Sequence, residues 1–330
     1  MPSAQPPDRP PRAARRALLA DWAELGKLRL SLLVVATTAA GYAIAPDGRG
    51  DIGRLMLAVC GTLLAALGAN GLNQWAERER DGRMHRTRER PLPAGRMTPH
   101  HAFAVSTAWA VAGVGLLAAF VNLLTAALAL GVVLLYVLVY TPLKPRSTLN
   151  TLVGAVCGAL PPLMGWTAAT GALAPGAFVL AGVLFVWQIP HFLALAWLYR
   201  DDYERGGYCM LPARDDDGRI CSTMVLLYAL ALVPVALVGH VAGLAGWLYA
   251  GAAVLLGSAL AATGVLLVGD RSRRSARRVF LASLVYLPLL LAALVADRAP
   301  AAPGASRVEA RLADASGTAP PAPPAPSAPR

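Results

Sequence analysis

The sequence predicts an all-α fold in which about nine transmembrane helices form a bundle around a central cavity. The first observation is composition: of 330 residues, 56% are hydrophobic and 15% are charged, and the mean hydropathy is +0.51. Soluble globular domains carry about 25% charged residues. The second observation is that the apolar residues come in runs of roughly 20, the length that crosses a bilayer core about 30 Å thick.

The apolar runs define the elements in order along the chain. Each run is bounded by polar or charged residues, as expected of a membrane-spanning helix. The predicted spans are 28–45, 54–75, 101–120, 122–141, 150–171, 176–198, 221–240, 245–268 and 278–296. They divide the chain into a cytosolic N-terminal tail at 1–26, a membrane domain at 27–297 and a C-terminal tail at 298–330. The C-terminal tail is rich in Ala and Pro, so we expect it to be disordered.

The charges between the spans predict the orientation. Arg and Lys cluster in the loops after the second, fourth, sixth and eighth spans, whereas the loops on the other side hold Arg49 and Arg54. Basic loops face the cytoplasm, which places the N-terminus inside and the C-terminus outside, in a bacterial inner membrane. The net charge of +11 is spread over short clusters between apolar runs. We therefore predict a lipid bilayer and no nucleic acid as the partner surface.

A polar stripe is predicted where the second span ends, in the segment NQWAERERDGRMHRTRERPLPAGR at 73–96. Asn73, Glu77 and Asp81 are four residues apart, and on a helix each such step advances about 40° around the axis and about 6 Å along it. Two carboxylates and an amide offer the hard oxygen ligands that suit Mg²⁺, which bridges a few carboxylates to substrate phosphates. The alternative is a solvated helix end, with Glu77 near Arg78 and Arg80.

A second acidic group follows the sixth span. Asp201 and Asp202 lie at the same predicted membrane face as the stripe. Two carboxylate sets facing each other would repel unless cations lie between them. Basic side chains nearby could hold the oxygens of a diphosphate already bridged to metal. Such a site suits the ionisation of an allylic diphosphate, in which cations neutralise the leaving group and aromatic walls shelter the carbocation.

Three segments, in the same order along the chain, resemble the UbiA-type superfamily of intramembrane prenyltransferases. The pattern NxxxExxxDxxMxRTxxRPLPAGR at 73–96 is similar to the first aspartate-rich motif of the family. The segments at 140–166 and 188–203 are similar to the branch that farnesylates protohaem. The resemblance covers all but the two tails. Two departures stand out: Glu77 is where the family usually has Asp, and Leu28 separates Lys27 from Arg29 where Pro is common.

The resemblance implies the transfer of a farnesyl group from farnesyl diphosphate to a vinyl group of protohaem (haem b), giving haem O and diphosphate. It implies Mg²⁺ as the cofactor and leaves open a downstream haem-modifying or oxidase-assembly partner. The metal-linked catalytic set carried over is Asn73, Glu77, Asp81 and Asp202, with Asp201 as a further metal candidate. The diphosphate-binding candidates are Lys27, Arg29, Arg86, Arg90, Lys144, Arg146 and Arg200.

Four residues are candidates for the substrate pocket: Tyr140, Asn150, His191 and Tyr203. His191 could ligate haem iron or make a hydrogen bond between helices. A substrate that must leave as product gains little from tight axial ligation, so the hydrogen bond is the favoured interpretation. The aromatic rings could equally be lipid-interface anchors or walls of the carbocation site.

Two other functions remain to be compared with this one. A prenyltransferase of the same superfamily could act on an aromatic quinone precursor, although the QIPHF and ALPPLMGW segments favour haem. A membrane transporter would use charges near the bilayer midplane to move an anion. The predicted carboxylates cluster at one membrane edge, and the spans lack ionisable residues near their centres, which argues against a transporter.

Overall fold

The computed structural model describes residues 11–46 and 51–298, and these ranges contain helices and no β-strand. Within them, eight helices are long and apolar enough to cross a membrane, and there are nine if the bent pair α1–α2 forms one span. The prediction of an all-α protein with about nine spans is confirmed. The predicted tail at 298–330 lies outside the described residues except for Arg298, as do residues 1–10 of the N-terminal tail.

The helices follow the predicted spans closely. Their bounds are α1 Pro11–Leu25, α2 Leu28–Ile44, α3 Ile52–Asp81, α4 Pro99–Phe120, α5 Leu123–Leu134, the π-helix η1 Leu135–Tyr140, α6 Thr141–Leu143, α7 Asn150–Thr170, α8 Pro175–Leu198, α9 Arg200–Arg205, α10 Leu211–Arg214, α11 Arg219–Val241, α12 Trp247–Asp270 and α13 Arg273–Ala296. Short loops make most long helices antiparallel to their neighbours in sequence.

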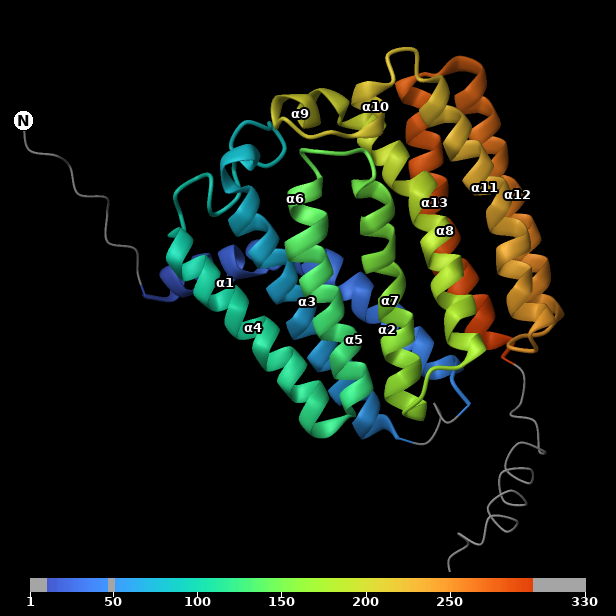
Figure 1. Ribbon diagram of the computed structural model, residues 1–330, viewed down its shortest axis with the longest axis horizontal. Helices are drawn as coiled ribbons and strands as arrows, with labels where there is room; N and C mark the ends of the chain where they lie inside the picture. Colours follow the sequence, from blue (N-terminus) through green and yellow to red (C-terminus); the bar gives the residue numbers. More distant parts are fainter. Residues whose placement is uncertain (1–10, 47–50, 299–330) are drawn as a thin grey trace, which may run out of the picture. The chain divides into compact units, whose positions relative to one another are not determined.

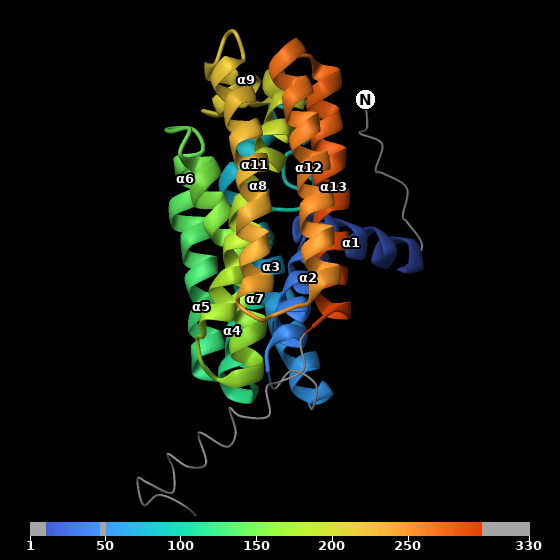
Figure 2. The same cartoon turned by 90° about the vertical axis from the view of Figure 1, so that its right-hand side faces the viewer.

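The long helices lie side by side in two groups (Figures 1 and 2). Helices α2, α3, α4, α5 and α7 pack together, and α8, α11, α12 and α13 form the second group. The contacts of α7 with α8 and of α2 with α13 join the groups. The short helices α9 and α10 lie beyond one end of the long helices, the end at which α3 and α6 also finish (Figure 1).

Glycines allow the helices that carry the site to approach closely. A Cβ atom on Gly165 of α7 would collide with the carbonyl oxygen of Thr38 on α2, and one on Gly113 of α4 would collide with the backbone of α3 at Ala65. Close backbone approach of this kind is how helices associate in lipid, where apolar side chains gain little by leaving the tails. These contacts hold α2 against α7 and α3 against α4.

Two helix ends differ from the limits of the predicted spans. The N-terminal tail contains α1, whose Leu18–Leu25 part is bent 54° from α2. The bend falls at Lys27, which has a left-handed backbone conformation with φ 48°. Helix α3 continues six residues beyond the predicted limit of 75, to Asp81. It continues because its last polar side chains are buried against neighbouring segments instead of facing water.

Candidate functional site

The stripe on α3 exists and is buried. Asn73 is 0% exposed, Glu77 5% and Asp81 1%. The alternative of a solvated helix end is therefore wrong. Arg78, which was expected near Glu77 in that alternative, instead contacts Glu79 at 3.6 Å and stacks on the Trp75 ring.

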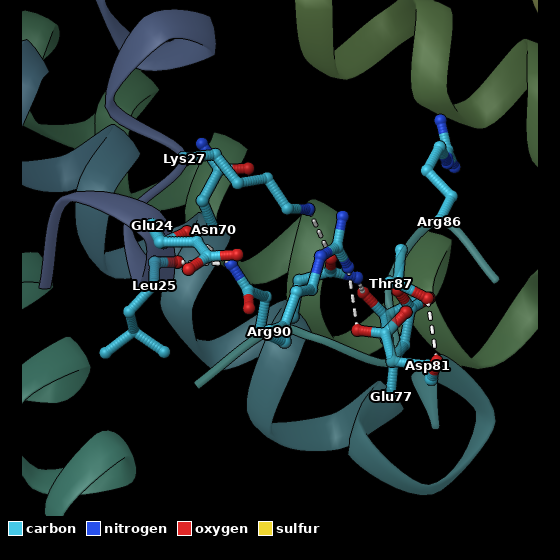
Figure 3. A network of polar contacts seen from close by, with 12 residues as sticks. Glu24, Leu25, Lys27, Asn70, Glu77, Asp81, Arg86, Thr87 and Arg90 are labelled. Carbon is cyan, nitrogen blue, oxygen red and sulfur yellow. Dashed lines mark hydrogen bonds and ion pairs between the residues drawn. The ribbon is translucent and has the colours of Figure 1, made fainter. Parts of the chain in front are cut away.

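Each side chain of the stripe contacts one basic side chain. Lys27 Nζ donates a hydrogen bond to Asn73 Oδ1 at 2.8 Å. Lys144 Nζ lies 2.8 Å from Glu77 Oε1, and Arg90 Nη1 lies 2.7 Å from Asp81 Oδ2. Figure 3 shows Lys27 and Arg90 reaching toward the stripe, with Arg90 close to the Asp81 carboxylate. The three cations come from different segments: the α1–α2 bend, the end of α6 and the loop after α3.

Lys144, just beyond α6, remains charged although it is buried. Burial opposes the charged form, but the Glu77 carboxylate, together with Tyr136 and Tyr208, outweighs it, and the pKa of Lys144 lies above its ordinary value. The Tyr140 ring lies 4.8 Å from its Nζ, which adds a cation–π contact. Tyr140 itself fits against α7 because Gly154 is opposite it, where a Cβ atom would come within 2.8 Å of the ring.

Asp202 organises the loop that carries Arg90. Its carboxylate accepts hydrogen bonds from the backbone N–H groups of His85 and Arg86, at 3.1 and 3.3 Å, and from Arg205 Nη2 at 2.6 Å. Burial alone would raise the pKa of Asp202, but these donors stabilise the carboxylate and hold its pKa below the ordinary value. Asp202 is thus buried near the start of the same loop that begins after Asp81.

The other charged candidates lie apart from the stripe. Arg29, Arg146, Arg200 and Asp201 are exposed. Asp201 is 72% exposed and contacts Arg200 at 3.7 Å. Arg86 stacks on the rings of Tyr199 and Tyr203, 4.7 and 5.5 Å from their centroids, and Figure 3 shows it apart from Arg90. Of the seven basic candidates, the structure brings Lys27, Arg90 and Lys144 together at the stripe.

His191 makes the hydrogen bond between helices that the sequence interpretation favoured. Its ring stacks between Trp187 of α8 and Phe280 of α13, each 5.0 Å away, and Nδ1 lies 2.9 Å from Ser283 Oγ. Ser283 donates its own proton to the Phe280 carbonyl at 2.7 Å. A proton on Nδ1 of His191 would satisfy both contacts of the Ser283 hydroxyl at once.

Asn150 has a structural role in the described contacts. Its Nδ2 donates to the carbonyl oxygens of Ser147 and Cys209, at 2.6 and 2.9 Å. It thereby ties the start of α7 to the segment between α9 and α10. Tyr203 accepts a hydrogen bond from Arg86 at 3.3 Å.

Sequence reasoning missed the segment 206–210 and two side chains that hold the site. Arg80 Nη1 donates to the carbonyl oxygens of Gly206 and Gly207, at 3.0 and 2.9 Å. Gln74 donates to the carbonyl oxygens of Glu24 and Leu25, which fixes the end of α1 next to Lys27. Both residues lie inside the segment 73–96, at the end of the second predicted span. They contact backbone atoms of residues far away in the sequence, and the spacing of residues along the chain cannot indicate such contacts.

The donor set of the stripe fits Mg²⁺ held jointly with a substrate phosphate. No group of three or more His, Cys, Asp or Glu side chains within 11–46 and 51–298 is arranged to hold a metal by itself. Mg²⁺ does not require such a group, since it commonly binds one or two carboxylates together with substrate phosphates and water. Glu77 and Asp81 supply those carboxylates and Asn73 an amide oxygen.

Two cavities lie elsewhere in the bundle. One of about 310 Å³ is lined by Leu256, Leu281 and Tyr286, between α12 and α13. Another of about 280 Å³ is lined by Arg219 and Arg271. Neither includes a stripe residue, so the central cavity stays a prediction.

Comparison with known proteins identifies the family. The model of the UbiA prenyltransferase family matches residues 34–287, which include the stripe, Lys144 and Asp202. The chain belongs to the UbiA prenyltransferase family. Solved structures agree on the fold: a digeranylgeranylglyceryl phosphate synthase superposes with a TM-score of 0.72 at 16% identity, covering 84% of this chain and 98% of that one. A UbiA homologue from Archaeoglobus fulgidus bound to DMAPP and Mg²⁺ superposes with a TM-score of 0.63 at 12% identity, covering 83% and 99%.

Curated relatives in the UbiA family carry a more specific name. Human mitochondrial protoheme IX farnesyltransferase is 44% identical over 282 residues, which are 86% of this chain and 63% of the human protein. The chain therefore spans less than two thirds of that relative. The protoheme IX farnesyltransferases of Solibacter usitatus and of Anaeromyxobacter sp. strain Fw109-5 are 40% and 48% identical. These matches cover 84% and 82% of this chain, and 98% and 90% of the relatives.

Proposed function

We propose that this protein transfers the farnesyl group of farnesyl diphosphate to a vinyl group of protohaem, giving haem O and diphosphate. The observation that carries the proposal is the buried stripe of Asn73, Glu77 and Asp81, with a basic side chain in contact with each. The names of relatives that are 40–48% identical support protohaem as the acceptor.

The stripe would hold Mg²⁺ through Glu77 and Asp81, with Asn73 beside them. When bound, the metal supplies positive charge that neutralises the departing diphosphate. Asp202 is a positioning residue in this proposal, because its oxygens already bind the backbone of the loop that carries Arg90. Asp201, which is 72% exposed and contacts Arg200, is not part of the proposed ligand set.

In this proposal the basic side chains at the stripe bind the diphosphate oxygens. Lys144 and Arg90 now neutralise Glu77 and Asp81, and Lys27 donates a hydrogen bond to the Asn73 amide oxygen. A bound metal would take over the neutralisation of the two carboxylates. The N–H donors of the basic side chains would then turn to the phosphate oxygens. Once they are in place, donors directed at the charge that develops on a leaving group lower the barrier for its departure.

The allylic cation requires apolar and aromatic surroundings. Tyr136 and Tyr140 stack 5.0 Å apart on η1, and Lys144 lies over the Tyr140 ring. Aromatic faces stabilise cations and exclude water from them. The vinyl carbon of protohaem forms the new bond to the farnesyl carbon, and water adds to the resulting cation with loss of a proton.

We infer that the site faces the cytosol from a bacterial inner membrane. The arginine-rich loop after α3 lies at this end of the helices, and basic loops stay on the cytoplasmic side. This orientation leaves the N-terminus inside and the C-terminus outside. It also allows the haem product to pass sideways within the membrane to a downstream haem-modifying or oxidase-assembly partner.

The test is product analysis in membranes. Membranes containing the protein are incubated with Mg²⁺, farnesyl diphosphate and protohaem, and haem O is measured by mass spectrometry. We expect haem O with the wild type, none with Asp81→Ala, and normal amounts with Arg274→Ala, which removes an exposed cation of α13. Prenylation of an aromatic acid without haem O would favour the quinone-precursor alternative. Anion transport without diphosphate release would favour a transporter.

A further inference from the structure

The segment 206–210, between α9 and α10, is fixed against the stripe by backbone contacts. Arg80, near the end of α3, binds the carbonyl oxygens of Gly206 and Gly207. On the other side, the Cys209 N–H donates to the Lys144 carbonyl at 2.7 Å. Tyr208 is held between these anchors, with its ring 5.8 Å from Arg80 Cζ and 5.7 Å from Lys144 Nζ.

The Tyr208 hydroxyl is buried and has no hydrogen-bond partner among the described residues. Tyr208 is 5% exposed, and its Oη is inaccessible to solvent. Buried hydroxyls are normally paired, so an unpaired one in a functional region calls for an explanation. Burial and the neighbouring Glu77 carboxylate both raise the pKa of Tyr208, so the hydroxyl keeps its proton at neutral pH.

The cations around the stripe differ from this hydroxyl in one respect. Lys27, Lys144 and Arg90 are already bound to stripe oxygens. An incoming anion must compete for them with Asn73, Glu77 and Asp81. The Tyr208 O–H faces no such competition, and an acceptor that arrives beside Lys144 would satisfy it.

We propose that the Tyr208 hydroxyl donates a hydrogen bond to a phosphate oxygen of the diphosphate substrate. This inference rests on the proposed function, because it requires the diphosphate to lie at the stripe. The Tyr208 hydroxyl is an uncharged donor, so it can contact the diphosphate without forming an ion pair with Glu77 or Asp81. The hydroxyl remains unpaired until the anion is bound, which favours the loaded state of the site.

The test compares two substitutions that each remove one buried, unpaired hydroxyl. Tyr208→Phe keeps the ring and its contacts with Lys144 and Arg80. Tyr286→Phe, on α13, is the matched control, since Tyr286 is 1% exposed and its hydroxyl also has no partner in the described chain. Binding of Mg²⁺ with inorganic pyrophosphate, and with an unreactive thio analogue of farnesyl diphosphate, is measured by calorimetry in detergent, together with Tm.

We expect Tyr208→Phe to weaken binding of both probes about ten- to hundredfold, as for the loss of a hydrogen bond to a charged group. Its Tm should stay the same or rise, because an unpaired polar atom has been removed. Tyr286→Phe should leave both affinities unchanged. The KM for protohaem should not change in Tyr208→Phe, because the hydroxyl contacts the donor and not the acceptor.

Two results would overturn the inference. One is wild-type affinity for both probes in Tyr208→Phe. The other is a lowered Tm in Tyr208→Phe, which would mean that the hydroxyl has a structural partner in the empty site. If the wild-type protein binds neither probe, the proposed function itself is wrong. If the wild type binds both probes and Tyr208→Phe binds them equally well, only the role of the Tyr208 hydroxyl is wrong.

Discussion

Lys144 Nζ lies 2.8 Å from Glu77 Oε1, so two residues 67 positions apart form a largely buried ion pair. The pair joins α3 to the segment after α6. The family resemblance implies Asp where Glu77 stands, and the longer side chain is the one that meets this lysine. The longer Glu77 side chain, where the family usually has Asp, is therefore accompanied by a contact with Lys144.

Removing Lys144 should be costly because it leaves Glu77 buried and unpaired. We expect Lys144→Met to lower the free energy of unfolding by about 3 kcal/mol, the usual scale for breaking a buried pair from one side. The double variant Glu77→Gln/Lys144→Met should recover much of that loss, which unfolding in detergent would measure. A double variant as unstable as the sum of the two single changes would show that the pair is not coupled.

Glu77→Asp should keep Mg²⁺-dependent turnover. The shorter arm restores the ligand that the family resemblance implies, while it moves the carboxylate away from Lys144. We expect a loss of about 1 kcal/mol in stability and activity within tenfold of the wild type, measured as diphosphate release. Loss of all activity would mean that the site geometry depends on the longer side chain.

The spacing of Asn73, Glu77 and Asp81 was enough to predict the stripe, because helical periodicity is a local property. It could not indicate which of the many basic residues reach it. Arg90 and Arg86 lie in the same loop, yet one contacts Asp81 and the other stacks on Tyr199. That choice depends on how Asp202 holds the backbone of the loop, which involves residues more than 100 positions away.

Asp202→Asn should change the acid stability of the protein. The donors around Asp202 lower its pKa from the ordinary 3.8, so ionised Asp202 stabilises the folded state above that pH. This contribution is lost as the pH falls through the lowered pKa. We expect the variant to have a lower Tm than the wild type at pH 7, with the difference shrinking below about pH 4. A Tm difference that is constant from pH 7 to pH 3 would contradict the assignment.

Gly165→Ala should disrupt the contact between α2 and α7. Its Cβ would collide with the Thr38 carbonyl, a backbone atom that cannot rotate away. We expect a loss of about 2 kcal/mol or more, as for overpacking of a tight interface, and a displaced Lys27. Gly251→Ala is the control, since a Cβ there meets nothing within 4 Å. Equal Tm values for the two variants would show that α2 tolerates the displacement.

Two features of the site could not be predicted from the sequence. Residues Leu135–Tyr140 form a π-helix, although nothing in LYVLVY distinguishes them from the α-helix before them. Such turns often occur at functional positions. Tyr208 follows two glycines in a loop, and its unpaired hydroxyl becomes evident when α3, Lys144 and the loop are assembled. Both depend on tertiary contacts, which local propensity does not encode.

A structure of the protein in lipid with Mg²⁺ and an unreactive thio analogue of farnesyl diphosphate would test the central claim most directly. We predict that the metal lies on Glu77 and Asp81, and that Lys144 and Arg90 have left those carboxylates for phosphate oxygens. A bound analogue elsewhere in the bundle, with the Lys144–Glu77 and Arg90–Asp81 pairs intact, would contradict it.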